Sequence, residues 1–123
     1  MISKLKEVNL TNQANLEVRT YSGGMKRRLS ILLSTIGRQN IIFLDEPTTG
    51  LDPVNKRFIW TLIQKIKRQK AVILTTHSME EADFLSDRIG VIVEGNMKCI
   101  GTPLELKNTY GSGYLLTFGN FKF

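Results

Sequence analysis

The chain has 123 residues, of which 41% are apolar, so it can form at most one domain with a modest hydrophobic core. Its formal net charge of +6 suggests a nucleic-acid partner, but no aromatic residues are interleaved with the basic runs 26–28 and 65–70, so base stacking has little support. We expect no nucleic-acid partner, and we interpret these runs as helix faces that meet solvent or anionic lipid headgroups.

Cysteine content and hydropathy exclude two further classes of protein. Cys99 is the single cysteine, which excludes an internal disulfide framework and is typical of a reducing compartment. No apolar run approaches the roughly 18 residues that a membrane-spanning helix needs. The opening stretch Met-Ile-Ser-Lys-Leu-Lys-Glu lacks the apolar core of a signal peptide. We therefore expect membrane association only through a partner.

The first third of the chain is predicted to contain two helical stretches, separated by the turn-prone residues 9–15. Ile2, Leu5 and Val8 have a fragment of helical spacing, which suggests the end of a helical subdomain. A strongly periodic helix follows, with Ser22 suited to its N-cap. Gly23 and Gly24 indicate either an ordinary glycine turn or an anion site made by unobstructed backbone N–H groups. The apolar stripe of this helix is Met25, Leu29, Leu32, Leu33 and Ile36.

A buried strand ends in two acids at the centre of the sequence. The four apolar residues 41–44 predict a strand buried on both faces, as in a parallel sheet. Asp45 and Glu46 follow directly, and Pro47 prevents a simple continuation of the strand. The pair indicates either a solvated turn or a ligand site of the Walker B kind, in which one acid organises Mg²⁺ and the next handles the attacking water.

A helix and a second strand come next. Asp52 can cap a helix that has Pro53 at its first position and runs to about residue 70. The apolar run 71–74 predicts another buried strand, and His77 follows its end. Because the intervening helix has the length of a crossover connection, we expect the two strands to be adjacent and parallel. The buried stripe of the helix is predicted to be Phe58, Ile59, Leu62, Ile63 and Ile66, with Trp60 and Lys65 off it.

The remaining segments are short. Ser78 and Glu81 have the spacing of a capping box, and they predict a helix to about residue 86. Two strands, 88–94 and 97–100, are predicted to form a hairpin at Gly95-Asn96 that extends the sheet. A short helix through about residue 108 and a last strand over 114–118 complete the chain.

The order of these motifs resembles the C-terminal half of an ABC transporter ATP-binding domain, over about residues 5–118. Residues 21–25 resemble the ABC signature, 41–46 the Walker B strand, 51–52 the D-loop, and His77 the switch histidine. The signature variant Tyr-Ser-Gly-Gly-Met-Lys-Arg-Arg-Leu-Ser and the segment 97–114 resemble the A subfamily of lipid exporters.

The resemblance implies an α/β fold with a P-loop NTPase-like parallel sheet core and a C-terminal β-hairpin. The core is expected to be partial, because the Walker A half is lacking. Residues 1–37 would be the end of the helical subdomain with the signature motif, and residues 38–123 would run from Walker B to the C-terminal part of the core.

The resemblance also implies ATP and Mg²⁺ as cofactors and a role for each motif residue. Asp45 would hold Mg²⁺ through water, Glu46 would be the general base, and His77 would contact the γ-phosphate. Met25 replaces the glutamine that is usual in the signature. The residues expected to bind nucleotide are Ser22, Gly23, Gly24, Met25 and Asp52.

The implied partners are a second ABC ATPase domain in a head-to-tail dimer and the transmembrane domains of a transporter. These would place the chain on the cytoplasmic side of a membrane. No Gly-x-x-x-x-Gly-Lys-Ser/Thr loop occurs in the sequence, so we expect the isolated chain to hydrolyse no ATP. Two alternatives remain: a non-catalytic ABC fragment that acts as an interaction protein, and a piece of a soluble ABC ATPase with no role in transport.

Overall fold

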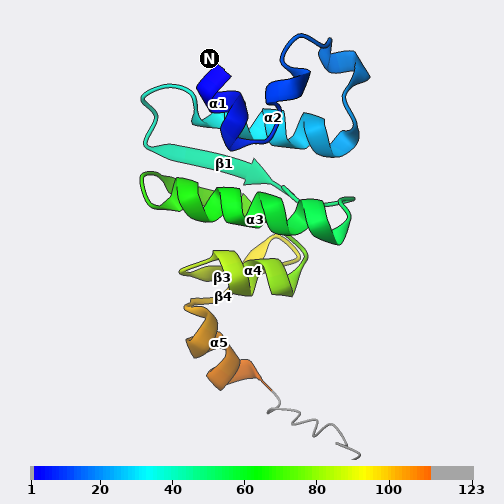
Figure 1. Ribbon diagram of the computed structural model, residues 1–123. Coiled ribbons are helices and arrows are strands. Elements are labelled where there is room, and N and C mark those ends of the chain that lie inside the picture. The colour runs from blue at the N-terminus through cyan, green and yellow to red at the C-terminus, as the bar shows by residue number, and fades with distance from the viewer. Residues whose placement is uncertain (1, 112–123) are drawn as a thin grey trace, which may run out of the picture. The chain divides into compact units, whose positions relative to one another are not determined.

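The computed structural model describes residues 2–111, which divide into two compact units, one ending at Leu85 and the other beginning at Ser86 (Figure 1). The first unit contains α1 (Ile2–Glu7), α2 (Gly23–Thr35), β1 (Ile41–Asp45), α3 (Pro53–Lys67), β2 (Ala71–Thr75) and α4 (Met79–Leu85), with 3-10 turns at Thr11–Gln13 and Val18–Thr20. The second contains β3 (Ile89–Val93), β4 (Asn96–Gly101) and α5 (Pro103–Tyr110). The α/β class predicted from the sequence is confirmed. No helix in the described range combines the length and apolarity needed to cross a bilayer.

Strands β1 and β2 form the parallel pair that the sequence predicts. Their register runs from Ile41 opposite Ala71 to Asp45 opposite Thr75. Helix α3 is the crossover connection between them. Because the strands are parallel and in this register, their carboxyl ends lie at the same edge of the sheet.

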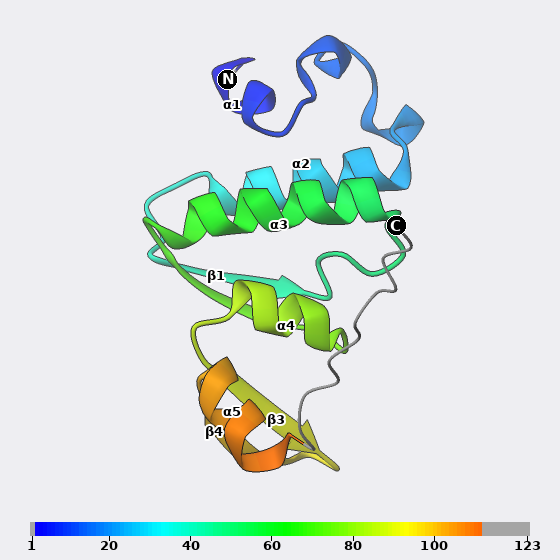
Figure 2. The same cartoon turned by 60° about the horizontal axis from the view of Figure 1, so that its bottom comes forward.

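Helices α2 and α3 lie side by side with their N-termini at the same end (Figures 1 and 2). Both caps follow the prediction. The Ser22 side chain accepts a hydrogen bond from the Met25 N–H, and the Asp52 carboxylate accepts from the N–H groups of Val54 and Asn55. Each cap satisfies donors that a helix N-terminus would otherwise leave unpaired.

The hydrophobic core of the first unit lies against one face of the sheet. Ile42 and Leu44 are buried there, whereas Ile41, Phe43 and Ile73 are exposed. The prediction that β1 is buried on both faces is therefore wrong for the described chain, in which the strands alternate between a covered and an open face. The core consists of Val8, Leu10, Tyr21, Ile31, Leu32, Ile42, Leu44, Ile59, Trp60, Leu62, Ile63 and Leu85.

Two details of the predicted helix stripes are wrong. In α2, Ile31 is buried while Leu33 and Ile36 are exposed. Because α2 contacts α1, α3 and β1, it buries the neighbouring residues 31 and 32, a wider face than a single stripe. In α3, Trp60 is buried because α4 covers that side of the helix, where its ring stacks on Phe84 with centroids 5.0 Å apart.

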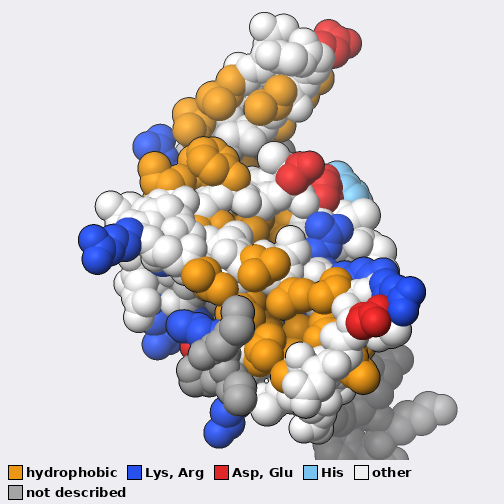
Figure 3. Space-filling view, turned by 90° about the horizontal axis from the view of Figure 1, so that it is seen from above, with side chains coloured by type: hydrophobic (Ala, Val, Ile, Leu, Met, Phe, Trp, Pro, Cys, Tyr) orange, Lys and Arg blue, Asp and Glu red, His pale blue; other side chains and the backbone are white. Residues whose placement is uncertain are grey.

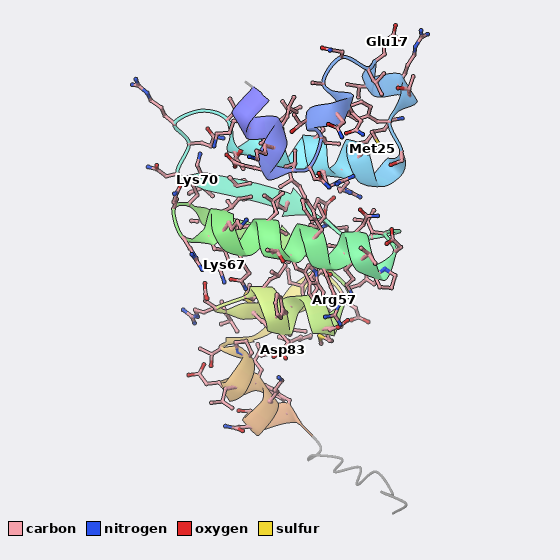
Figure 4. All side chains as sticks on the ribbon, in the orientation of Figure 1. Glu17, Met25, Arg57, Lys67, Lys70 and Asp83 are labelled. Atoms are coloured by element: carbon pink, nitrogen blue, oxygen red, sulfur yellow. The ribbon has the colours of Figure 1, made fainter. Side chains whose placement is uncertain are left out.

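Helix α4 packs along α3 within the first unit. Figure 4 shows the two helices side by side, with Arg57 labelled on α3 and Asp83 on α4. These two residues, with Trp60 and Phe84, belong to the lining of a groove between the helices. The α3–α4 junction thus combines charged side chains with the buried Trp60 ring and the exposed Phe84 ring.

The second unit is a β-hairpin followed by a capped helix. Strands β3 and β4 are antiparallel and form their own two-stranded sheet. The prediction that the hairpin extends the parallel sheet is wrong for the described residues, because β3 and β4 pair only with each other and neither is hydrogen-bonded to β1 or β2. The turn lies at Glu94 and Gly95, one residue earlier than predicted, and both have the positive φ of a type I′ turn. The strand expected over 114–118 lies outside the described residues.

Candidate functional site

The two acids that end β1 meet the end of β2. The Glu46 N–H lies 3.1 Å from the Thr75 carbonyl oxygen and 3.2 Å from Thr75 Oγ1, so the last rung of the sheet fixes the backbone of the second acid. The hydroxyl of Thr75 donates to the carboxylate of Asp45, which faces it in the strand register. Both acids are therefore positioned by the same threonine.

His77 contacts the second acid directly. Its Nδ1 lies 2.9 Å from Glu46 Oε2, and the Thr49 hydroxyl donates to the same oxygen at 2.7 Å. The hydrogen bond from Thr49, followed by that from His77, lowers the pKa of Glu46 below its usual value of 4.5. Figure 3 shows the only histidine of the chain, in pale blue, beside acidic side chains on the surface. The structure thus brings together an ionised carboxylate and an exposed imidazole.

The backbone of Glu46 has a positive φ angle, which is unusual for a residue other than glycine. Its φ is +45°, in the left-handed region that a residue other than glycine seldom adopts. A turn closes directly behind it, with the Thr49 N–H 3.3 Å from the Glu46 carbonyl oxygen. Strained residues of this kind concentrate at functional sites, where the surrounding structure holds them in place.

The oxygen atoms at this edge of the sheet suit a hard cation. Asp45 contributes an exposed carboxylate and Thr75 a hydroxyl, and both are oxygen donors. Among the described residues, no group of three or more acidic, histidine or cysteine side chains could enclose a metal ion. Mg²⁺ commonly takes only one or two carboxylates and completes its shell with water and substrate phosphate. The residues present therefore fit a Mg²⁺ ion that arrives with nucleotide.

The signature-like residues form a second group, at the N-termini of α2 and α3. A Cβ placed on Gly24 would lie 3.4 Å from the side chain of Asn55, so glycine permits the two helix starts to approach closely. A Cβ on Gly23 would meet no atom within 4 Å, which leaves that backbone open. The side chain of Asn55 also lowers the pKa of Asp52, with a smaller contribution from its backbone N–H. Because a helix N-terminus carries a partial positive charge, the adjacent N-termini of α2 and α3 favour binding of an anion beside them.

The site residues predicted from the sequence are thus distributed over two places. Glu46 contacts His77 and lies beside Asp45, while Ser22 and Gly24 contact Met25 and Asn55 respectively. Met25, labelled in Figure 4, lies in the first turn of α2 and packs partly against the core. Its backbone N–H already serves the Ser22 cap.

Sequence reasoning missed the threonines that hold the acids. Thr75 is the last residue of β2, and Thr49 lies three residues beyond Glu46. The predicted parallel pairing contained a signal for Thr75, because matching the two strands end to end places it opposite Asp45. Thr49 carried no comparable signal, since its contact depends on the positive φ of Glu46.

The amino-acid sequence is similar to those of known ATP-binding proteins. Residues 4–83 match a family profile described as "AAA domain, putative AbiEii toxin, Type IV TA system". The chain is 53% identical over 113 residues to ABC transporter A family member 9 of Arabidopsis thaliana and 53% identical over 116 residues to member 2. It belongs to the ATP-binding domains of the ABC transporter A subfamily.

The alignments that show this membership cover most of the chain but only a small part of each relative. The alignments include 92% of the chain with member 9 and 94% with member 2, yet only 12% of either relative. ABC member 8 of the same plant is 51% identical over 115 residues, which are 92% of this chain and 13% of that protein. ATP-binding domains of the ABC family use nucleotide and Mg²⁺ in general, which agrees with the oxygen donors beside Glu46.

Proposed function

We propose that this ABC domain segment supplies the water-activating pair of an ATPase that powers transport. The observation that carries the proposal is the 2.9 Å contact between Glu46 Oε2 and His77 Nδ1 at the carboxyl edge of a parallel sheet. Asp45 precedes this pair, where a carboxylate can organise Mg²⁺. Phosphoryl transfer depends mainly on positioning and charge neutralisation, and these residues offer both.

Each residue of the pair has a distinct task in this proposal. Glu46 would accept the proton of the attacking water, because its carboxylate is ionised at neutral pH. His77 donates from Nδ1 to Glu46, and its imidazolium form, with a second proton on Nε2, would also donate to the γ-phosphate. Asp45 would hold Mg²⁺ through water, and the bound ion would neutralise phosphate charge.

The N-termini of α2 and α3 would serve a nucleotide held mainly by a second domain. We assign Ser22, Gly23 and Gly24 to its γ-phosphate, through backbone N–H groups at a helix start, and Asp52 to the seam between the domains. Met25 would lie beside this phosphate in the first turn of α2, while its backbone N–H stays with Ser22 Oγ. The partner would be a second ABC ATPase domain in a head-to-tail dimer, with residues 1–37 as a helical subdomain and 38–123 as the core.

The transport reaction would require transmembrane domains, which would hold this segment at the cytoplasmic side of a membrane. Lipids are the cargo class that we propose. The support is membership of the A subfamily together with the signature variant at residues 21–30, which resembles that of lipid exporters.

The experiment joins this chain to an N-terminal segment that carries the Gly-x-x-x-x-Gly-Lys-Ser/Thr loop of an ABC ATP-binding domain, and it measures phosphate release from Mg-ATP in a single turnover. We expect Glu46→Gln to lower the rate by at least about 100-fold, the usual contribution of a general base, while nucleotide binding persists. The matched control is Glu94→Gln, the same change in the β3–β4 turn, which should leave the rate unaltered. Equal rates for Glu46→Gln and the unmutated protein would contradict the proposal.

A further inference from the structure

Glu81 is an acid that the first unit buries completely. Only 1% of its surface is exposed. Its N–H donates to Ser78 Oγ at 3.3 Å, as expected of the third residue of a capped helix, but its carboxylate does not return to the cap. Instead Glu81 Oε1 accepts hydrogen bonds from Thr48 Oγ1 at 2.7 Å and from Trp60 Nε1 at 2.9 Å. A buried carboxylate needs such partners, because desolvation without them is costly.

The Thr48 bond joins the two segments that carry the proposed catalytic pair. Thr48 lies two residues beyond Glu46 and is itself buried, at 6% exposure. Glu81 lies in the first turn of α4, which begins at Met79, two residues beyond His77. The Thr48–Glu81 bond therefore ties the turn behind Glu46 to the helix behind His77, at a place buried from solvent.

The hydrogen bond from Trp60 to Glu81 joins α3 to α4, and several other contacts also join these two helices. Lys56 Nζ lies 3.1 Å from a carboxylate oxygen of Glu80, 3.5 Å from Ser78 Oγ and 4.7 Å from the centre of the Trp60 ring. The Trp60 ring also stacks on Phe84. Loss of the Trp60 donor would leave the contacts of Lys56 with Glu80 and Ser78 in place. Loss of the Thr48 donor would instead remove the tie to the turn behind Glu46.

We propose that Glu81 is a positioning residue, which sets the separation of Glu46 and His77 by holding Thr48 to α4. The inference rests on the proposed function only in treating that pair as working groups. The contact itself can be measured without any hydrolysis. A failure of the ATPase experiment would therefore not affect the test that follows, and a failure of this test would leave the ATPase proposal standing.

The test uses ring ¹⁵N and ¹H nuclear magnetic resonance of the 123-residue chain, in which His77 is the only histidine. Glu46→Ala gives the reference signal for the lost contact. Thr48→Val removes one donor to Glu81 Oε1 with little change of shape, and Trp60→Phe removes the other donor to the same oxygen. Ile63→Val is the control for a small loss of core volume in the same unit.

We expect Thr48→Val to move the His77 signal most of the way to the Glu46→Ala position. Trp60→Phe and Ile63→Val should leave it close to that of the unmutated chain, and so should Thr48→Ser, which keeps the hydroxyl. The proposal is overturned if folded Thr48→Val keeps the unmutated signal, or if all the variants shift it alike. Thr48→Ala removes the same hydroxyl without adding a methyl group, and the same two outcomes decide the matter if Thr48→Val does not fold.

Discussion

At the scale of single residues, the site is organised by threonine hydroxyls around two acids. Thr75 serves Asp45 and the backbone of Glu46, and Thr49 serves the carboxylate of Glu46. The sequence indicated the acids and His77, because each directly follows or closely follows an apolar run that predicts a strand. It did not indicate the positive φ of Glu46, which depends on the turn that Thr49 closes.

The cap of α3 gives a prediction on pH. Asn55 lowers the pKa of Asp52 below 3.8, so the folded chain binds this proton less readily than the unfolded chain. The stabilisation is complete above the ordinary pKa and is lost as the pH falls through the folded value. Asp52→Asn still caps the helix but does not titrate.

We therefore expect the unmutated chain to lose more stability than Asp52→Asn between neutral pH and about pH 3. The measurement is denaturant unfolding followed by the fluorescence of Trp60, the only tryptophan, which lies in the same unit. An equal loss of stability in both proteins would contradict the assigned cause.

At the scale of elements, the caps, the strand pairing and most of the buried stripe of α3 were predictable, whereas the burial of Trp60 and the open face of the sheet were not. Ser22 and Asp52 fixed two helix starts, and apolar runs on either side of a crossover helix fixed the parallel pair. Trp60 could not be placed, because its burial depends on α4, which is distant in the sequence. Glu81 matched a capping pattern, yet its carboxylate satisfies Thr48 and Trp60, since a buried acid takes the donors that tertiary packing provides.

The open face of the parallel sheet gives a prediction at this scale. Phe43 is 73% exposed on a strand that pairs only with β2 in the described chain, and apolar sheet surface with unpaired edges promotes association. We expect Phe43→Thr, which keeps strand propensity, to reduce concentration-dependent self-association in sedimentation experiments.

The matched control is Leu33→Gln, which removes an exposed apolar side chain from α2. It should reduce association less than Phe43→Thr does, because a helix offers no strand edge to a second chain. An equal effect of the two substitutions would show that general hydrophobicity, and not the sheet face, causes the association.

At the scale of the whole molecule, we propose that this chain is one part of an ABC ATPase. The chain spans 12% of the length of relatives such as member 9. Its sequence contains Asp45, Glu46 and His77, to which we assign roles in hydrolysis, but no Gly-x-x-x-x-Gly-Lys-Ser/Thr run. Because such a loop binds the β- and γ-phosphates, we expect Glu46 in the isolated chain to have no phosphate held beside it.

The most direct measurement of this claim is phosphate release from Mg-ATP by the purified 123-residue chain, compared with Glu46→Gln. Trp60 fluorescence would first establish that both proteins are folded. We expect both proteins to release phosphate at the same background rate, because another segment is needed to hold the phosphates of ATP in position. Turnover by the unmutated chain above that of Glu46→Gln would show that the phosphate-binding loop is not needed, and the central claim would fail.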